Sequence, residues 1–172
     1  TNAVYPNSRA GRYELISTDY ADLDVFIDAA TALENADAPK IGDEYVAIIG
    51  PYVKGRLFKN TAFREAVRYQ KDSLFTGELC SIDGVRFVVT STAPTVSNQG
   101  SQSTVATIDQ SIVLGKGAYG IARLMPGDFK VTVTPPGGHG DEYEVKTSMT
   151  WKSYLKAVRL QEAWMRRVET AR

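Results

Sequence analysis

The sequence predicts an α+β fold, because it places an amphipathic helix, a buried strand and a tight hairpin in succession. The helix is expected to run for about 16 to 18 residues between Ser17-Thr18 and Pro39, since apolar residues recur there every three or four positions. The apolar run Tyr45–Ile49 predicts a buried strand. Asp83-Gly84 predicts a tight turn, because Gly accepts a positive φ, and the β-branched and aromatic run Val85–Thr90 predicts the strand after it.

The totals fit one soluble domain, or one domain with an appended arm. At 172 residues the chain can form a core, and its hydrophobic fraction of 43% and charged fraction of 23% are typical of soluble proteins. With a net charge of zero, the overall charge does not point to a nucleic-acid or membrane partner, and no apolar run is long enough to span a bilayer. Residues 1–17 are expected to be a loosely ordered lead-in, with a short strand at Tyr13–Ile16. They carry neither a signal-peptide pattern nor a Met, so we expect a processed chain or a fragment.

Helices, strands and loops follow one another through the middle of the chain. Pro51 is placed to begin a second helix, and Asn60 or Thr61 to cap a third. Residues 95–107 are nearly all small and polar, which predicts a mobile surface loop. The next elements are expected to be a strand at Ile108–Leu114, a short helix at Gly115–Leu124 and a strand at Phe129–Thr134.

The pattern of the last thirty residues is compatible with either a strand or a helix. Apolar and small residues alternate there with lysines at a period of two, which is typical of a strand. An overlapping set also fits helical spacing: Trp151, Tyr154, Leu155, Val158 and Met165. Periodicity therefore leaves both open. We favour a long strand that turns near Gln161-Glu162 and returns through Trp164–Val168, partly because of the resemblance described below.

No motif predicts a catalytic, cofactor or metal site. Residues 115–120 read GKGAYG and match the GxGxxG turn of dinucleotide-binding units, but no second strand with a terminal acidic residue follows. We expect these glycines to serve turn geometry and close packing. His139 is the single histidine and lies in a predicted loop, which fits neither a metal site nor a triad. We expect no enzyme; the alternative is a nucleotide-binding enzyme that uses the GKGAYG turn.

Several short motifs together resemble a known family. In order they are NADAP at residues 35–39, YVAIIGP at 45–51, GE at 77–78 with DGVRFV at 83–88, GKGAYG at 115–120 and WK at 151–152. Their order and spacing resemble the major capsid (coat) proteins of tailed bacteriophages, from about Thr18 to the C-terminus.

This resemblance implies the Hong Kong-type phage coat fold. Residues 18–136 would form the α+β core of the axial domain, a mixed sheet flanked by helices, and residues 137–172 would form the C-terminal long strands of the peripheral domain. The family's N-terminal arm, extended loop and spine helix should precede this region, and residues 1–17 are too few to hold them.

The resemblance also implies a structural function. The protein would assemble with itself, as pentamers and hexamers, into an icosahedral head around double-stranded DNA that it contacts non-specifically. Scaffolding, portal and decoration proteins would be further partners, with no membrane and no cofactor. The protein would be found in the virion capsid, and in the host cytoplasm during assembly. A cellular nanocompartment shell of the same fold is a further alternative.

Seven residues are expected to have a structural or interface role: Glu78, Asp83, Gly84, Arg86, Trp151, Lys152 and Trp164. Glu78 and Arg86 are expected to face each other across the hairpin, where they would fix strand register or a subunit contact. The two tryptophans are interpreted as core or interface anchors rather than as base-stacking residues.

Overall fold

The chain divides into two compact units. The computed structural model describes residues 2–69, 78–97, 107–123, 129–137, 143 and 145–172, apart from the side chains of residues 69 and 78–80. Unit 1 comprises Thr1–Ala118 with Gln161–Arg172, and unit 2 comprises Tyr119–Leu160. The contacts therefore divide the chain at Ala118 and Leu160, whereas the sequence placed boundaries at residues 17 and 136.

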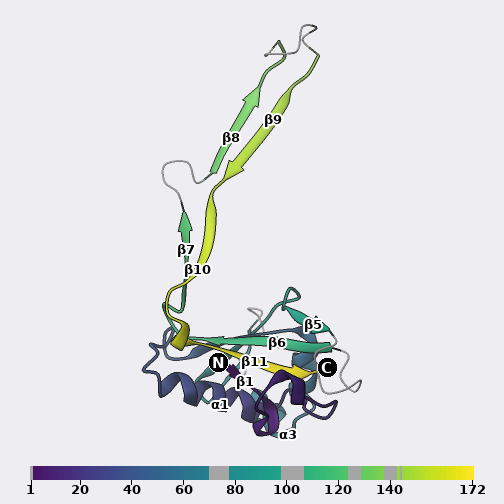
Figure 1. Cartoon of the computed structure of the whole chain (residues 1–172), viewed down its shortest axis with the longest axis vertical. Coiled ribbons are helices and arrows are strands. Elements are labelled where there is room, and N and C mark those ends of the chain that lie inside the picture. The colour runs from purple at the N-terminus through teal and green to yellow at the C-terminus, as the bar shows by residue number, and fades with distance from the viewer. Residues whose placement is uncertain (1, 70–77, 98–106, 124–128, 138–142, 144) are drawn as a thin grey trace. The chain divides into compact units, whose positions relative to one another are not determined.

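Unit 1 is built on a seven-stranded mixed sheet with the order β1-β11-β6-β2-β4-β3, in which β5 also pairs with β6 (Figure 1). Its strands are β1 (Ala3–Val4), β2 (Tyr45–Ile49), β3 (Glu78–Ile82), β4 (Val85–Val89), β5 (Thr95–Ser97), β6 (Thr107–Leu114) and β11 (Met165–Ala171). β2 is parallel to β4 and β1 is parallel to β11, while the other pairs are antiparallel. The predicted α+β class with a mixed sheet is confirmed.

Helix α1 (Leu23–Glu34) covers one face of this sheet and is shorter than predicted. It begins after Asp22, whose carboxylate accepts a hydrogen bond of 2.7 Å from the Leu23 amide. The Asp19 carboxylate instead accepts from the Ile16 amide, which holds the residues before Asp22 in a loop. Phe26, Ala29 and Leu33 are fully buried against the sheet, together with Tyr45, Ala47 and Phe87.

The two short helices after β2 are confirmed. α2 (Pro51–Leu57) has Pro51 at its first turn, where the missing N–H leaves no hydrogen bond unmade. α3 (Thr61–Tyr69) contributes Phe63 to the core, where its ring meets those of Phe58 and Phe87 edge to face.

The lead-in is tied to the sheet, contrary to the expectation of a loose segment. It contains β1 and the 3-10 turns η1 (Pro6–Ser8) and η2 (Arg12–Glu14), so the strand expected at Tyr13–Ile16 is wrong. Leu15 is fully buried against Ile108 and Ala171, and this contact holds the segment to the ends of β6 and β11.

The hairpin of β3 and β4 is as predicted. Asp83 and Gly84 both have a positive φ, of 50° and 73°, as a primed two-residue turn requires. The loop expected at residues 95–107 is wrong at its start, because Thr95–Ser97 pairs with β6 through Asp109, Ile108 and Thr107. Residues 98–106 lie outside the described part of the chain.

Unit 2 consists of two antiparallel strand pairs (Figure 1). β7 (Tyr119–Arg123) pairs with β10 (Leu155–Arg159), and β8 (Phe129–Thr134) pairs with β9 (Ser148–Ser153). The short helix expected at Gly115–Leu124 is wrong: residues 119–123 form a strand, since each one pairs with a residue of β10.

The favoured structure of the C-terminal segment is confirmed. β9 and β10 are strands, the 3-10 turn η3 (Glu162–Trp164) lies at the expected turn, and β11 returns antiparallel to β6.

Candidate assembly surfaces

One face of the β8–β9 pair is apolar and exposed. The pairing places Val131 opposite Trp151 and Val133 opposite Met149, and Phe129 lies two residues from Val131 on the same face. The Phe129 and Trp151 rings stack with centroids 6.3 Å apart. All five side chains are exposed, from 41% for Val131 to 73% for Met149. We call these five residues the apolar face.

The opposite face of the same pair is polar and basic. Lys130 lies directly opposite Lys152, Thr132 opposite Thr150, and Thr134 opposite Ser148. Two like charges directly opposite one another destabilise an antiparallel pair. We call these six residues the basic face.

The β7–β10 pair and Leu160, which directly follows it, also expose large apolar side chains: Tyr119, Ile121, Leu155, Val158 and Leu160. An isolated two-stranded pair is at best marginally stable in water, and exposed apolar patches of this kind mark interaction surfaces. The exposed apolar side chains on the described strands of unit 2 are therefore a candidate interaction surface. The alternation in FKVTVT was visible in the sequence, but the exposure of its apolar side was not.

The predicted interface tryptophans have different surroundings. Trp151 belongs to the apolar face with 68% of its surface exposed, and neighbouring Lys152 has its ammonium 5.8 Å from the centroid of the Tyr154 ring. Trp164 is partly buried against the core of unit 1, and its carbonyl accepts a hydrogen bond of 3.0 Å from the Gly115 amide.

The hairpin residues predicted to face each other do not lie directly opposite. Glu78 pairs with Val88, and Arg86 pairs with Ser81. The Ser81 hydroxyl instead donates a hydrogen bond to the Glu44 carboxylate. The roles of Glu78 and Arg86 in register or subunit contact remain predictions.

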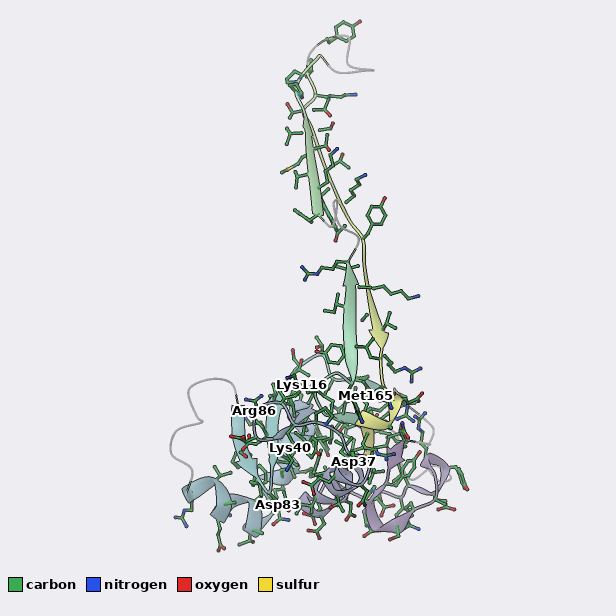
Figure 2. The ribbon with its side chains drawn as sticks, turned by 90° about the vertical axis from the view of Figure 1, so that its left-hand side faces the viewer. Asp37, Lys40, Asp83, Arg86, Lys116 and Met165 are labelled. Carbon is green, nitrogen blue, oxygen red and sulfur yellow. The ribbon has the colours of Figure 1, made fainter. Side chains whose placement is uncertain are left out.

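Charged residues gather around the tip of this hairpin. Figure 2 shows Lys40 between Asp83 and Lys116. The Lys40 ammonium lies 2.9 Å from a Glu34 carboxylate oxygen and 5.3 Å from the centroid of the Tyr45 ring. The hydrogen bond that the Lys40 ammonium donates to Glu34, together with the negative charge of Glu34, raises the pKa of Lys40.

The glycines of residues 115–120 serve turn geometry and close packing, as expected. A Cβ at Gly115 would lie 2.9 Å from the Pro39 carbonyl oxygen, and Gly117 has a φ of +77°. The turn leads into strand β7, whereas a dinucleotide site requires it to open a helix.

Unit 1 contains a buried carboxylate that the sequence did not indicate. Glu169 is fully buried and accepts hydrogen bonds from Arg12 and Gln110, with Arg167 2.7 Å away. Burial alone raises the pKa of Glu169, but the hydrogen bond from Arg12 and the charges of Arg167 and Arg12 lower it below its ordinary value. Because Arg12 lies 157 residues away in sequence, this contact depends on the fold.

A second buried carboxylate is poorly satisfied. Asp109 is 4% exposed, and its Oδ2 lacks a hydrogen bond among the described residues, with Arg172 Nε 3.7 Å away. Burial raises the pKa of Asp109, although the charge of Arg172 lowers it in part.

A groove of unit 1 with a volume of about 520 Å³ lies between the lead-in, the start of α1 and the end of α2. It is lined on the α1 side by Asp22, Asp24 and Asp28, and on the α2 side by Arg56 and Lys59. Within the described residues no three metal-binding side chains gather, and no helix is long and apolar enough to cross a membrane. His139 lies outside these residues.

Comparison with solved structures relates this fold to capsids. No family model matches the chain, and no curated protein matches its sequence significantly. The structure is similar to the capsid of Ralstonia phage GP4, with a TM-score of 0.73 and 15% identity over 99% of this chain and 52% of that chain. It is also similar to the capsid of the cyanophage P-SCSP1u, with a TM-score of 0.61 and 18% identity over 98% of this chain and 51% of that one.

A third similar structure is the holo-SrpI encapsulin complex from Synechococcus elongatus PCC 7942, with a TM-score of 0.56 and 14% identity over 95% of this chain and 54% of that chain. This chain spans about half the length of each of these three solved chains. At such low identities the likeness concerns the fold. The chain has the α+β fold of bacteriophage capsid proteins.

Proposed function

We propose that the chain belongs to a structural protein that assembles with itself into a closed shell. The observation that carries this proposal is the exposed apolar face of unit 2, because its five large side chains need a cover that the two strands do not provide. The capsid fold supports the same conclusion, since solved proteins with this fold form phage capsids.

The shell is that of a tailed phage. In this proposal pentamers and hexamers tile an icosahedral head around double-stranded DNA, with scaffolding, portal and decoration proteins as partners. The protein resides in the virion, after assembly in the host cytoplasm. The order of the sequence motifs and the phage capsids among the similar structures support this choice.

Trp151 and the other residues of the apolar face are the contacts that we expect assembly to bury. The hairpin residues Glu78, Asp83, Gly84 and Arg86 are a further contact proposed from the sequence, and Lys152 of unit 2 is a separate one. Trp164 is proposed to be an internal anchor, since it is partly buried against the core of unit 1.

A cellular nanocompartment shell is the second candidate, and the similarity to an encapsulin complex favours it. Such a shell would enclose protein cargo in place of DNA. The nucleotide-binding alternative loses its support, because residues 119–123 form a strand where that site needs a helix.

Expression of the full-length gene, with and without a co-expressed scaffolding protein, tests the proposal. Sedimentation and electron microscopy should find closed particles, and nuclease treatment should leave protected DNA in particles recovered from infected cells. Particles that hold protein cargo and no DNA would favour the nanocompartment. A stable monomer under every condition would contradict a shell function.

A further inference from the structure

We infer that the basic face of unit 2 contacts the acidic face of α1 on a second copy of this chain. This inference rests on the proposed shell function. The four described strands of unit 2, β7, β8, β9 and β10, carry five cations and no carboxylate: Arg123, Lys130, Lys152, Lys156 and Arg159. An antiparallel pair with Lys130 opposite Lys152 gains stability from an anionic partner that separates the two like charges.

The complementary surface lies on α1. This helix contains Asp24, Asp28 and Glu34 and no Lys or Arg. Asp24 and Asp28 are exposed and lie one turn apart on the same face. The chain as a whole has no net charge, and its basic strand surface and acidic helix surface have opposite charge, with Arg56 and Lys59 lining the same groove as Asp24 and Asp28.

The spacing of the two charge pairs also matches. Directly opposed residues of an antiparallel pair have Cβ atoms about 4.5–5.5 Å apart. Helical residues four apart have Cβ atoms about 5–6 Å apart. Lys130 and Lys152 can therefore each meet one carboxylate, with Asp24 and Asp28 as the partners.

A second copy is a better partner than DNA phosphate for this face. A contact between two different surfaces of identical subunits can repeat around a ring, and complementary charge fixes the register of such contacts. The threonines beside the lysines add hydroxyl donors that a carboxylate can accept.

Charge reversal in the full-length protein tests the contact. Variant one carries Lys130→Glu and Lys152→Glu, and variant two carries Asp24→Lys and Asp28→Lys. Each alone should lower the assembled fraction at low salt by about tenfold or more, because like charges then meet. An equimolar mixture of the two variants should recover six-membered rings, since the variants can alternate there and each supplies the charge that the other needs, whereas five-membered rings cannot alternate.

The control variant, Arg64→Glu with Arg68→Glu, makes the same change of net charge as variant one, but on the exposed side of α3, and should assemble normally. Circular dichroism checks that every variant is folded. Failure of the mixture to form six-membered rings, with recovery only when all four changes are in one chain, would overturn a contact between copies.

Normal empty shells from variant one, with reduced DNA retention, would overturn the inference in favour of phosphate binding. Normal shells with normal DNA would overturn it outright, while the shell function stands. Absence of particles from the unaltered protein would refute the shell function itself, and this inference with it.

Discussion

Arg12 fixes the lead-in to the sheet through the buried carboxylate of Glu169. Arg12→Met should lower the free energy of unfolding by about 1–3 kcal/mol, because it removes charge-assisted hydrogen bonds to a buried group. Lys40→Met is the control: it removes an exposed pair with Glu34 and should change the free energy of unfolding much less than Arg12→Met does. Urea denaturation measures both. Equal small effects would show that the Arg12 contact does not hold the lead-in.

The Glu169 carboxylate also makes the stability of the fold depend on pH. The folded-state pKa of Glu169 lies below its ordinary value of 4.5, so its stabilising contribution is present above 4.5 and is lost as pH falls through the folded-state value. The difference between Arg12→Met and the unaltered protein should therefore shrink in acid.

Ionisation of Asp109 has the opposite effect on the stability of the fold. Its folded-state pKa is raised, so ionisation of this buried carboxyl disfavours folding above that value and has no such effect below the ordinary value of 3.8. Asp109→Asn should raise the free energy of unfolding by about 1–2 kcal/mol at neutral pH, with a gain that disappears near pH 3. A loss of stability at neutral pH would instead show that the ion pair with Arg172 outweighs burial.

Two glycines allow a matched comparison. Gly115→Ala should cost about 1–3 kcal/mol, because the new Cβ would lie 2.9 Å from the Pro39 carbonyl oxygen. Gly55→Ala, inside α2 with no atom within 4 Å of the new Cβ, should stabilise by about 0.5–1 kcal/mol. Thermal unfolding checks both signs, and tolerance of alanine at 115 would contradict the close approach.

The elements that were predicted correctly are those whose structure is determined by neighbouring residues. The turn at Asp83-Gly84, the apolar run of β2 and the proline at the start of α2 each have a cause within a few residues, and all three are confirmed. The start of α1 was predicted too early, at Ser17-Thr18, because the Asp19 carboxylate accepts a hydrogen bond from the Ile16 amide and holds these residues in a loop.

Elements that depend on distant partners could not be predicted in this way. Residues 119–123 looked helical, but β10 supplies five cross-strand partners from residues 155–159. Thr95–Ser97 looked like loop, but it pairs with β6. Likewise, the contact between Arg12 and Glu169 joins the two ends of the chain and has no local signature.

The apolar face gives the prediction that belongs to an element. Trp151→Ser with Phe129→Ser should abolish assembly and leave the unfolding of unit 1 unchanged, since both residues lie in unit 2. The control is Thr132→Ser, on the basic face of the same strand. Sedimentation measures assembly, and normal particles from the double variant would show that the apolar face is not a subunit contact.

For the whole molecule, the fold could be predicted from the sequence, but the candidate contact surfaces could not. The motif order led to the capsid resemblance, and the solved structures agree in fold over nearly the whole chain. The contact surfaces could not be found in the same way, because exposure and cross-strand register appear only once the strands are paired.

A reconstruction of the assembled full-length protein by electron cryomicroscopy would show directly whether the apolar face lies at a subunit contact. We predict a closed shell of pentamers and hexamers in which Phe129, Trp151 and Met149 are covered by another segment. Particles in which these side chains face solvent, or a protein that never forms particles, would contradict it.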